Sequence, residues 1–234
     1  PLSFKKVESF RNFANKLWNI GRYVTATAKT EFIEWHAFEK ITPANLSPAD
    51  EWILARLEKT KSDVTRYLEN DNISLAAETL RDFTWNEYAD WYVEIHKIEK
   101  NDTTLVAVWN ELLKLWHPFM PFVTEAIWRE MYGETSLLMV ERWPGMLECG
   151  EIVGSTDYFD NPSLGPTMAE GSFATLQEII TVIRTARAEQ RIEPVKKLRA
   201  SVTTTNKGIN LIKNNAEVIK QLTRLEQLDT DTPG

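Results

Sequence analysis

The chain has 234 residues, of which 43% are hydrophobic and 11% aromatic, which is enough apolar material for one core and a second, smaller one. Its ordinary content of charged residues, with 9 glycines and 10 prolines, excludes collagen-like and low-complexity classes. The single cysteine, Cys149, excludes an internal disulfide and a cysteine-held zinc ion. No signal peptide and no apolar run of ~18 residues is present. We therefore expect a cytoplasmic protein without a membrane partner.

The charge is unevenly distributed along the chain. The formal net charge of -7 argues, as an average, against a nucleic-acid partner. Residues 1–29, however, carry six basic side chains and one acidic one, and residues 171–234 carry ten basic and seven acidic ones. The acidic excess therefore belongs to residues 30–170. Because an anion responds to charges within a Debye length of about 8 Å, these local balances indicate partners better than the average does.

Five helices are predicted in the first 149 residues. The first has apolar or small residues at spacings of three and four: Val7, Phe10, Ala14, Leu17, Gly21, Val24 and Ala28. The second begins with Ser47 as N-cap and Pro48 at the first helical position. The other three are expected over residues 74–100, 105–116 and 121–128. Short joints between them favour a mainly α, antiparallel helix bundle over residues 1–149.

The composition changes after the bundle. Residues 150–171 are rich in Gly, Pro, Ser and Asp and predict a linker. Residues 172–234 predict a helix over 173–189, a strand over 198–203, a helix over 207–222 and an extended segment over 225–228. This is a small α/β domain of marginal size, and we expect it to continue beyond Gly234 or to pack on the bundle.

The residues that enzymes use for bond chemistry do not form any familiar pattern. The chain has no nucleotide-binding glycine loop, no nucleophile elbow and no helical Glu-x-x-His pair. We predict no catalytic residue, no metal site and no cofactor within the chain. The acidic row on the third helix is interpreted as a solvated face: Glu78, Asp82, Glu87, Asp90 and Glu94.

The first helix carries a polar stripe about 150° from its apolar side, at 100° per residue. The stripe consists of Lys5, Asn12, Lys16, Asn19 and Tyr23, with Arg22 on its flank. Cations neutralise phosphate, carboxamides pair with base edges and an aromatic ring stacks on a base. This combination suits an unpaired RNA loop.

Three other interpretations remain open from the residues alone. The stripe could be an ordinary solvated face. The acidic, aromatic-rich chain could be a helical protein-interaction scaffold that does not bind RNA. A carboxylate-bridged metal enzyme has the least support, because the Glu-x-x-His pair is missing.

Four sequence motifs are informative when they are taken together. Residues 11–24 (RNFANKLWNIGRYV) resemble the run that opens the anticodon-binding bundle of the valyl-tRNA synthetase family of class I aminoacyl-tRNA synthetases, with Tyr23 where the family commonly has Phe. Residues 47–54 (SPADEWIL), 83–92 (FTWNEYADWY) and 117–128 (HPFMPFVTEAIW) follow in the family's order. Residues 183–189 (IRTARAE) and 225–226 resemble the following α/β linker domain.

The resemblance implies a fragment of an ATP-dependent valine-tRNA ligase that acts in protein biosynthesis. The catalytic domain, with its ATP site, would precede Pro1, and a coiled coil would follow Gly234. The implied partners are valine tRNA and these two domains, and we expect a monomer. Anticodon contacts carry over to Lys16, Asn19, Arg22 and Tyr23, while Asn12 and Lys5 come from the stripe. A second basic row, Arg184, Arg187 and Arg191, predicts phosphate contacts or salt bridges to the bundle.

Overall fold

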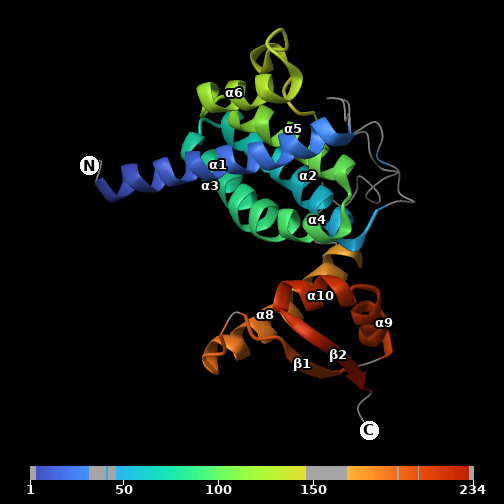
Figure 1. The fold of residues 1–234 in the computed structure, drawn as a ribbon. Helices are drawn as coiled ribbons and strands as arrows, with labels where there is room; N and C mark the ends of the chain where they lie inside the picture. Colours follow the sequence, from blue (N-terminus) through green and yellow to red (C-terminus); the bar gives the residue numbers. More distant parts are fainter. Residues whose placement is uncertain are drawn as a thin grey trace.

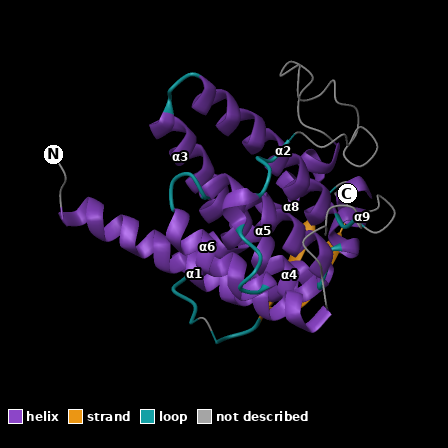
Figure 2. Cartoon of the chain, turned by 90° about the horizontal axis from the view of Figure 1, so that it is seen from above, coloured by secondary structure: helices purple, strands orange, loops and turns teal. Residues whose placement is uncertain are grey.

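The computed structural model describes residues 4–31, 41, 46–145, 168–193, 195–204 and 206–231. Helices α1 to α6 form an upper bundle, and a smaller unit of helices and two strands lies below it (Figure 1). Helices make up most of the described chain, with strands confined to the C-terminal part (Figure 2). This confirms a mainly α fold followed by a small α/β unit. The expected linker falls, up to residue 167, outside the described residues, so the domain boundaries stay a prediction.

Helix α1 (Phe4–Glu31) packs on the bundle through a stripe that overlaps the predicted one only in part. Of the predicted positions Leu17, Gly21 and Val24 are buried, and the other buried residues are Phe13, Ile20 and Thr25. Phe10, expected to face inward, is 57% exposed. The expectation for Phe10 was wrong because the first turns of α1 extend past the other described helices of the bundle (Figure 1).

Gly21 permits the close approach of α1 to helix α6 (Pro121–Tyr132). A Cβ placed on Gly21 would lie only 2.9 Å from Cγ2 of Ile127. A side chain at this position would therefore push the two helices apart. Packing explains this glycine without a bend, since α1 continues as one helix through it.

Helix α2 (Pro48–Glu69) begins as predicted. The Ser47 side chain accepts a hydrogen bond from the backbone N–H of Asp50, whose carboxylate in turn accepts from the Ser47 N–H. This capping box satisfies two donors at the helix start that would otherwise lack partners.

The third expected helix consists of three consecutive segments: α3 (Ile73–Asp82), a π-helical stretch η3 (Phe83–Tyr92) and α4 (Val93–Glu99). A 3.6-residue period does not predict the wider π turn. The stretch contains a buried aromatic stack, in which the Tyr88 ring lies 5.9 Å from both Tyr92 and Trp109. Single π turns are frequent at functional sites, so this stretch directs attention to the face that it presents.

Helix α5 (Asp102–Trp116) is the centre of the core, with most of its side chains buried. It is linked to α2 by a buried ionic cluster. The Lys61 ammonium, 1% exposed, lies 2.7 Å from Glu58 and 3.4 Å from Glu111. After α6, the short 3-10 helix η4 (Leu138–Val140) ends the bundle.

The C-terminal unit contains α8 (Met168–Glu189), β1 (Leu198–Thr203), α9 (Asn206–Asn214), α10 (Ala216–Thr223) and β2 (Leu225–Asp231). Helix α8 begins inside the predicted linker, and the helix expected over 207–222 is interrupted at Asn215. The two strands pair in parallel, with Ala200 opposite Leu228. A parallel pair requires a crossover, which α9 and α10 supply.

The two units are in contact. The ring of Phe173 in α8 stacks on Trp52 of α2 with centroids 4.2 Å apart, and α10 lies against α4. None of the helices in the described ranges is long and apolar enough to cross a membrane.

Candidate nucleic-acid interface

A groove of 460 Å³ runs between α1 and the η3–α4 segment. Its floor is apolar, formed by the nearly buried side chains of Ile20, Ala89 and Val93. The volume falls in the range of pockets that hold small ligands, which run from about 300 to 1,000 Å³. Four of the predicted site residues line this groove: Asn12, Lys16, Asn19 and Tyr23.

Carboxamides form the α1 side of the groove. Asn12, Asn15 and Asn19 are exposed, and none of their side-chain carboxamides hydrogen-bonds to another residue in the part of the chain that the structure describes. Each therefore offers a donor and an acceptor to an incoming group. Asn15 was not among the predicted site residues, because its helical angle lies beside the stripe, although it belongs to the motif at residues 11–24.

Lys16 is held by the opposite wall of the groove. Its ammonium lies 2.7 Å from a carboxylate oxygen of Asp90 and 3.7 Å from the centre of the Trp85 ring. The contact joins α1 to η3 and compensates the charge that sequence reasoning assigned to phosphate binding. Asp90 was predicted to lie on a solvated face, and only its pairing with a distant helix, which spacing cannot predict, makes it part of the groove.

The charges of the groove are nearly balanced. Lys97 pairs with Glu94 on α4, as Lys16 pairs with Asp90. An RNA backbone would gain little from a site with equal numbers of cations and carboxylates. The geometry instead favours contacts with a base, through carboxamides above an apolar floor.

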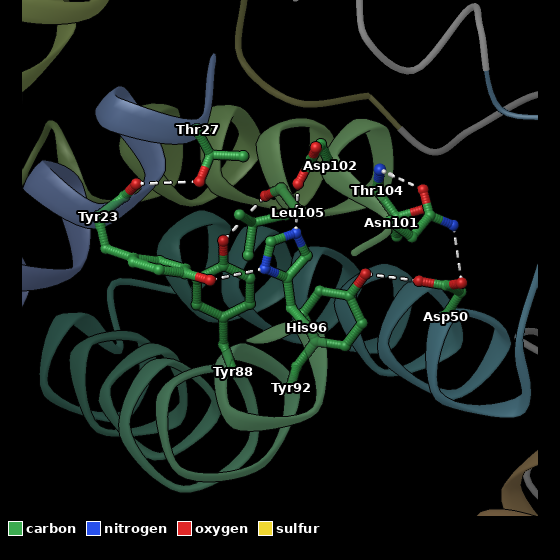
Figure 3. Close-up of polar contacts among 10 residues, drawn as sticks. All are labelled: Tyr23, Thr27, Asp50, Tyr88, Tyr92, His96, Asn101, Asp102, Thr104 and Leu105. Carbon is green, nitrogen blue, oxygen red and sulfur yellow. Dashed lines mark hydrogen bonds and ion pairs between the residues drawn. The ribbon is translucent and has the colours of Figure 1, made fainter. Parts of the chain in front are cut away.

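Tyr23 lines the groove, and its hydroxyl is anchored in the interior of the bundle. Its hydroxyl lies 2.8 Å from Nδ1 of His96, whose Nε2 lies 2.7 Å from Asp102 (Figure 3). The His96 ring is 2% exposed. Burial is the main influence on the pKa of His96 and lowers it, whereas the hydrogen bond that His96 donates to Asp102 acts to raise it. Burial, followed by the nearby Asp102 and Glu94 carboxylates, raises the pKa of Tyr23, so its hydroxyl stays protonated.

Arg22 lies away from these residues. It lines a separate hollow of 440 Å³ on the α6 side of α1, together with Trp18, Thr25 and Glu130. The structure therefore separates Arg22 from the four predicted site residues that line the groove. The side chain of Lys5 lies outside the described residues.

The arginines of α8 differ among themselves. Arg184 donates to the Leu222 carbonyl at 3.1 Å and lies 5.4 Å over the Trp91 ring. Arg187 donates to the backbone carbonyls of Glu193, Lys196 and Arg224. Arg191 is exposed and adopts a left-handed conformation at φ 50. The first two hold the C-terminal unit together, and phosphate contact by any of the three stays a prediction.

Comparison with known proteins identifies the class to which this fold belongs. The sequence family described as the anticodon-binding domain of tRNA ligase matches residues 50–203, about two thirds of the chain. The chain therefore belongs to this family. The match begins in α2, so it does not include α1 and its side of the groove.

Particular relatives extend the similarity through α1. The chain is 34% identical to the valine--tRNA ligase of Legionella pneumophila (strain Lens), with 97% of this chain and 25% of that protein covered. It is 35% identical to the valine--tRNA ligase of Carboxydothermus hydrogenoformans over 95% of this chain and 24% of that protein. The corresponding enzyme of Thermotoga maritima is 29% identical over 94% of this chain. The chain spans about a quarter of the length of these curated relatives.

Proposed function

We propose that this chain binds tRNA by accepting bases of the anticodon loop in the groove between α1 and the η3–α4 segment. The observation that carries the proposal is the row of three α1 carboxamides that have no hydrogen-bond partner among the described residues, set beside the Tyr23 ring above an apolar floor. Unpaired bases present both an edge for hydrogen bonds and a face for stacking. Membership in a family of anticodon-binding domains supports the same assignment.

Each residue has a distinct proposed role. Asn12 and Asn19, with Asn15, would bind base edges, and Tyr23 would supply a stacking surface. Lys16 would approach the backbone or a base edge while its charge remains shared with Asp90. Arg22 would contact a phosphate beside the groove, because it lies on the other side of α1. Lys5 and the α8 arginines would add phosphate contacts at the margins.

The names of the relatives suggest the larger context. We propose that the chain is part of an ATP-dependent valine-tRNA ligase, that its specific partner is valine tRNA, and that the chain acts in the cytoplasm as a monomer. Aminoacylation would be performed by a catalytic domain outside these residues, with a coiled coil as a further neighbour. Residues 1–149 and 172–234 would act as the RNA-binding and supporting units, respectively.

The test is a titration of the 234-residue chain with valine tRNA and with a tRNA that differs only in its anticodon. We expect weak binding, because contacts to the rest of the tRNA would raise the affinity through effective concentration in a longer protein. The valine anticodon should nevertheless bind several times more tightly. Equal affinity for the two tRNAs would refute base recognition by the groove, and no binding at low salt would refute the RNA partner altogether.

A further inference from the structure

The Tyr23 hydroxyl takes part in a three-residue chain of hydrogen bonds that crosses three helical segments. Tyr23 lies on α1, His96 on α4 and Asp102 at the start of α5, with consecutive polar atoms 2.8 and 2.7 Å apart (Figure 3). These distances are those of well-formed hydrogen bonds. This series of hydrogen bonds thus connects the wall of the groove to the interior of the bundle.

The chemistry of the three groups fixes the direction of both bonds. An ionised carboxylate can only accept, so Nε2 of His96 carries the hydrogen that is donated to Asp102. In a neutral imidazole the other nitrogen, Nδ1, is then an acceptor. The Tyr23 hydroxyl must therefore donate to it. Burial, which favours the neutral ring, agrees with this assignment.

One consequence concerns what Tyr23 can offer to a ligand. Its hydroxyl hydrogen points to the buried His96, so it is not available in the groove. The two rings meet edge to face, with centroids 5.8 Å apart and an angle of 82° between their planes. What remains for a ligand is the aromatic surface of Tyr23, held at a fixed angle.

A further layer of hydrogen bonds supports the corner that holds His96. Asn101 donates to Asp50 at 2.8 Å, and the Tyr92 hydroxyl donates to the other oxygen of the same carboxylate at 2.5 Å (Figure 3). Asp50 is 1% exposed and also belongs to the capping box of α2. The start of α2, the end of η3 and the turn before α5 are thereby joined, next to Asp102, which bonds His96.

We propose that His96 and Asp102 are positioning residues that hold the Tyr23 ring as a preoriented stacking surface for one unpaired nucleobase. The inference rests on the proposed function and names the residues that prepare the site for it. A stacking ring fixed before binding loses less conformational freedom when the base arrives. Neither His96 nor Asp102 touches the nucleobase.

A double-mutant cycle on tRNA affinity tests the proposal. Tyr23→Phe keeps the ring but removes the donor, and His96→Leu removes the acceptor while keeping an apolar side chain in the buried site. Each should weaken the binding of valine tRNA by about three- to tenfold, the effect of one ordinary hydrogen bond. The double variant should be no weaker than either single variant, because both changes remove the same interaction. If His96→Leu weakened tRNA binding in the Tyr23→Phe background as much as it does in the wild type, the proposal would be overturned.

Three further variants separate positioning from general damage to the fold. His96→Asn retains an acceptor near the position of Nδ1 and should restore most of the affinity. Asp102→Asn leaves a side chain that can donate as well as accept, so it should weaken binding in the wild-type background and have little further effect with Tyr23→Phe. His117→Leu makes the same exchange at a histidine that bonds Thr124 away from the groove, and it should leave the affinity unchanged. If His96→Asn bound as weakly as His96→Leu, a positioning role would be wrong.

Tyr23→Ala distinguishes failure of this inference from failure of the proposed function. A tRNA with 2-aminopurine in its anticodon loop reports stacking directly, since its fluorescence falls when the base stacks. We expect Tyr23→Ala to abolish this quenching and His96→Leu to reduce it. Unchanged affinity and quenching in Tyr23→Ala would overturn both proposals. If Tyr23→Ala lost affinity and quenching but the effects of Tyr23→Phe and His96→Leu on affinity were additive, only the positioning role would be overturned.

Discussion

Two rows of polar side chains at helical spacing, one on α1 and one on α8, differ in what their hydrogen-bonding groups contact. Arg184 and Arg187 on α8 donate to backbone carbonyls of the C-terminal unit. Asn12 and Asn19 on α1 have no such partner among the described residues and line a groove. The same helical spacing thus occurs in side chains that hold the C-terminal unit together on α8 and in side chains that remain open to a ligand on α1.

The difference shows which observation separates a binding surface from a structural one. Helical spacing indicates only that side chains share a face. A polar group that already has partners inside the protein must give them up to bind a ligand, and that exchange yields little net free energy. A group without partners can form new hydrogen bonds at no such cost. The availability of donors and acceptors is therefore more informative than charge.

The largest expected effect comes from removing the ring and the cation of the groove together. In Lys16→Ala/Tyr23→Ala, loss of stacking and of the positive charge should weaken valine tRNA binding by about 10- to 100-fold. Filter binding or fluorescence anisotropy at fixed salt measures the change. The matched comparison is Arg184→Ala/Arg191→Ala on α8, whose proposed phosphate contacts lie at the margins and should change the affinity by no more than about twofold. Equal losses in the two double variants would remove the distinction between the rows.

The second-largest effect concerns Arg187 of α8, which holds the C-terminal unit together. Arg187→Ala deletes donors to the carbonyls of Glu193, Lys196 and Arg224, and should lower the free energy of unfolding by about 1 to 3 kcal/mol. Urea denaturation measures it. Arg191→Ala, on the same helix but exposed, should change stability by less than about 0.5 kcal/mol. A variant of Arg187 that stays fully stable but loses tRNA affinity would identify this row as a phosphate-binding one.

A smaller effect distinguishes base recognition from simple attraction within the groove. Asn19→Ala removes one donor and one acceptor, so affinity for valine tRNA should fall by about three- to tenfold. Affinity for the anticodon-altered tRNA should change less, so the ratio between the two tRNAs falls. Lys16→Ala should instead weaken the binding of both tRNAs to a similar and smaller extent, because its charge is shared with Asp90 and a backbone contact carries no sequence information. A constant ratio in Asn19→Ala would contradict base contact by this residue.

Sequence reasoning predicted the helix bundle well because its helices have clear signals. Ser47 and Pro48 fixed the start of α2, and the apolar run before His117 defined α5. It was wrong where tertiary position decides burial. Phe10 fits the apolar spacing but lies on turns beyond the bundle. The π-helical stretch could not be predicted from a period of 3.6 residues.

The polar stripe predicted on α1 corresponds to one side of the groove, and the groove itself was not predicted. The stripe on α1 correctly named Asn12, Lys16, Asn19 and Tyr23 as neighbours, because one helix supplies them all. The opposite wall depends on contacts across 73 or 74 positions of the sequence, such as Lys16 with Asp90 and Tyr23 with His96. No spacing rule pairs residues at that distance. For this reason His96, which lacked a metal-site pattern, received no role until the fold was known.

The smallest predicted effect is the pH dependence that His96 gives to the anchor of the groove. The folded chain resists protonation of this ring, since burial lowers its pKa, whereas the unfolded chain takes up a proton near pH 6.5. The resulting stability is fully present above about pH 6.5 and is lost as the pH falls below it towards the lowered pKa. Tm should therefore fall by about 2 to 4 °C between pH 7.5 and 5.5.

His96→Asn should reduce that fall in Tm, because asparagine does not titrate. The titratable groups near His96 are Tyr23 from α1, Asp50 from α2, Lys100 from the end of α4 and Asp102 from α5. Asp50 and Asp102 raise the pKa of His96, and Lys100 lowers it. Glu99, whose pKa burial raises, acts in the opposite direction as the pH approaches its titration, so the decline should be clearest in the upper part of the range. Equal pH dependence in the two proteins would show that protonation of His96 does not control the anchor of Tyr23.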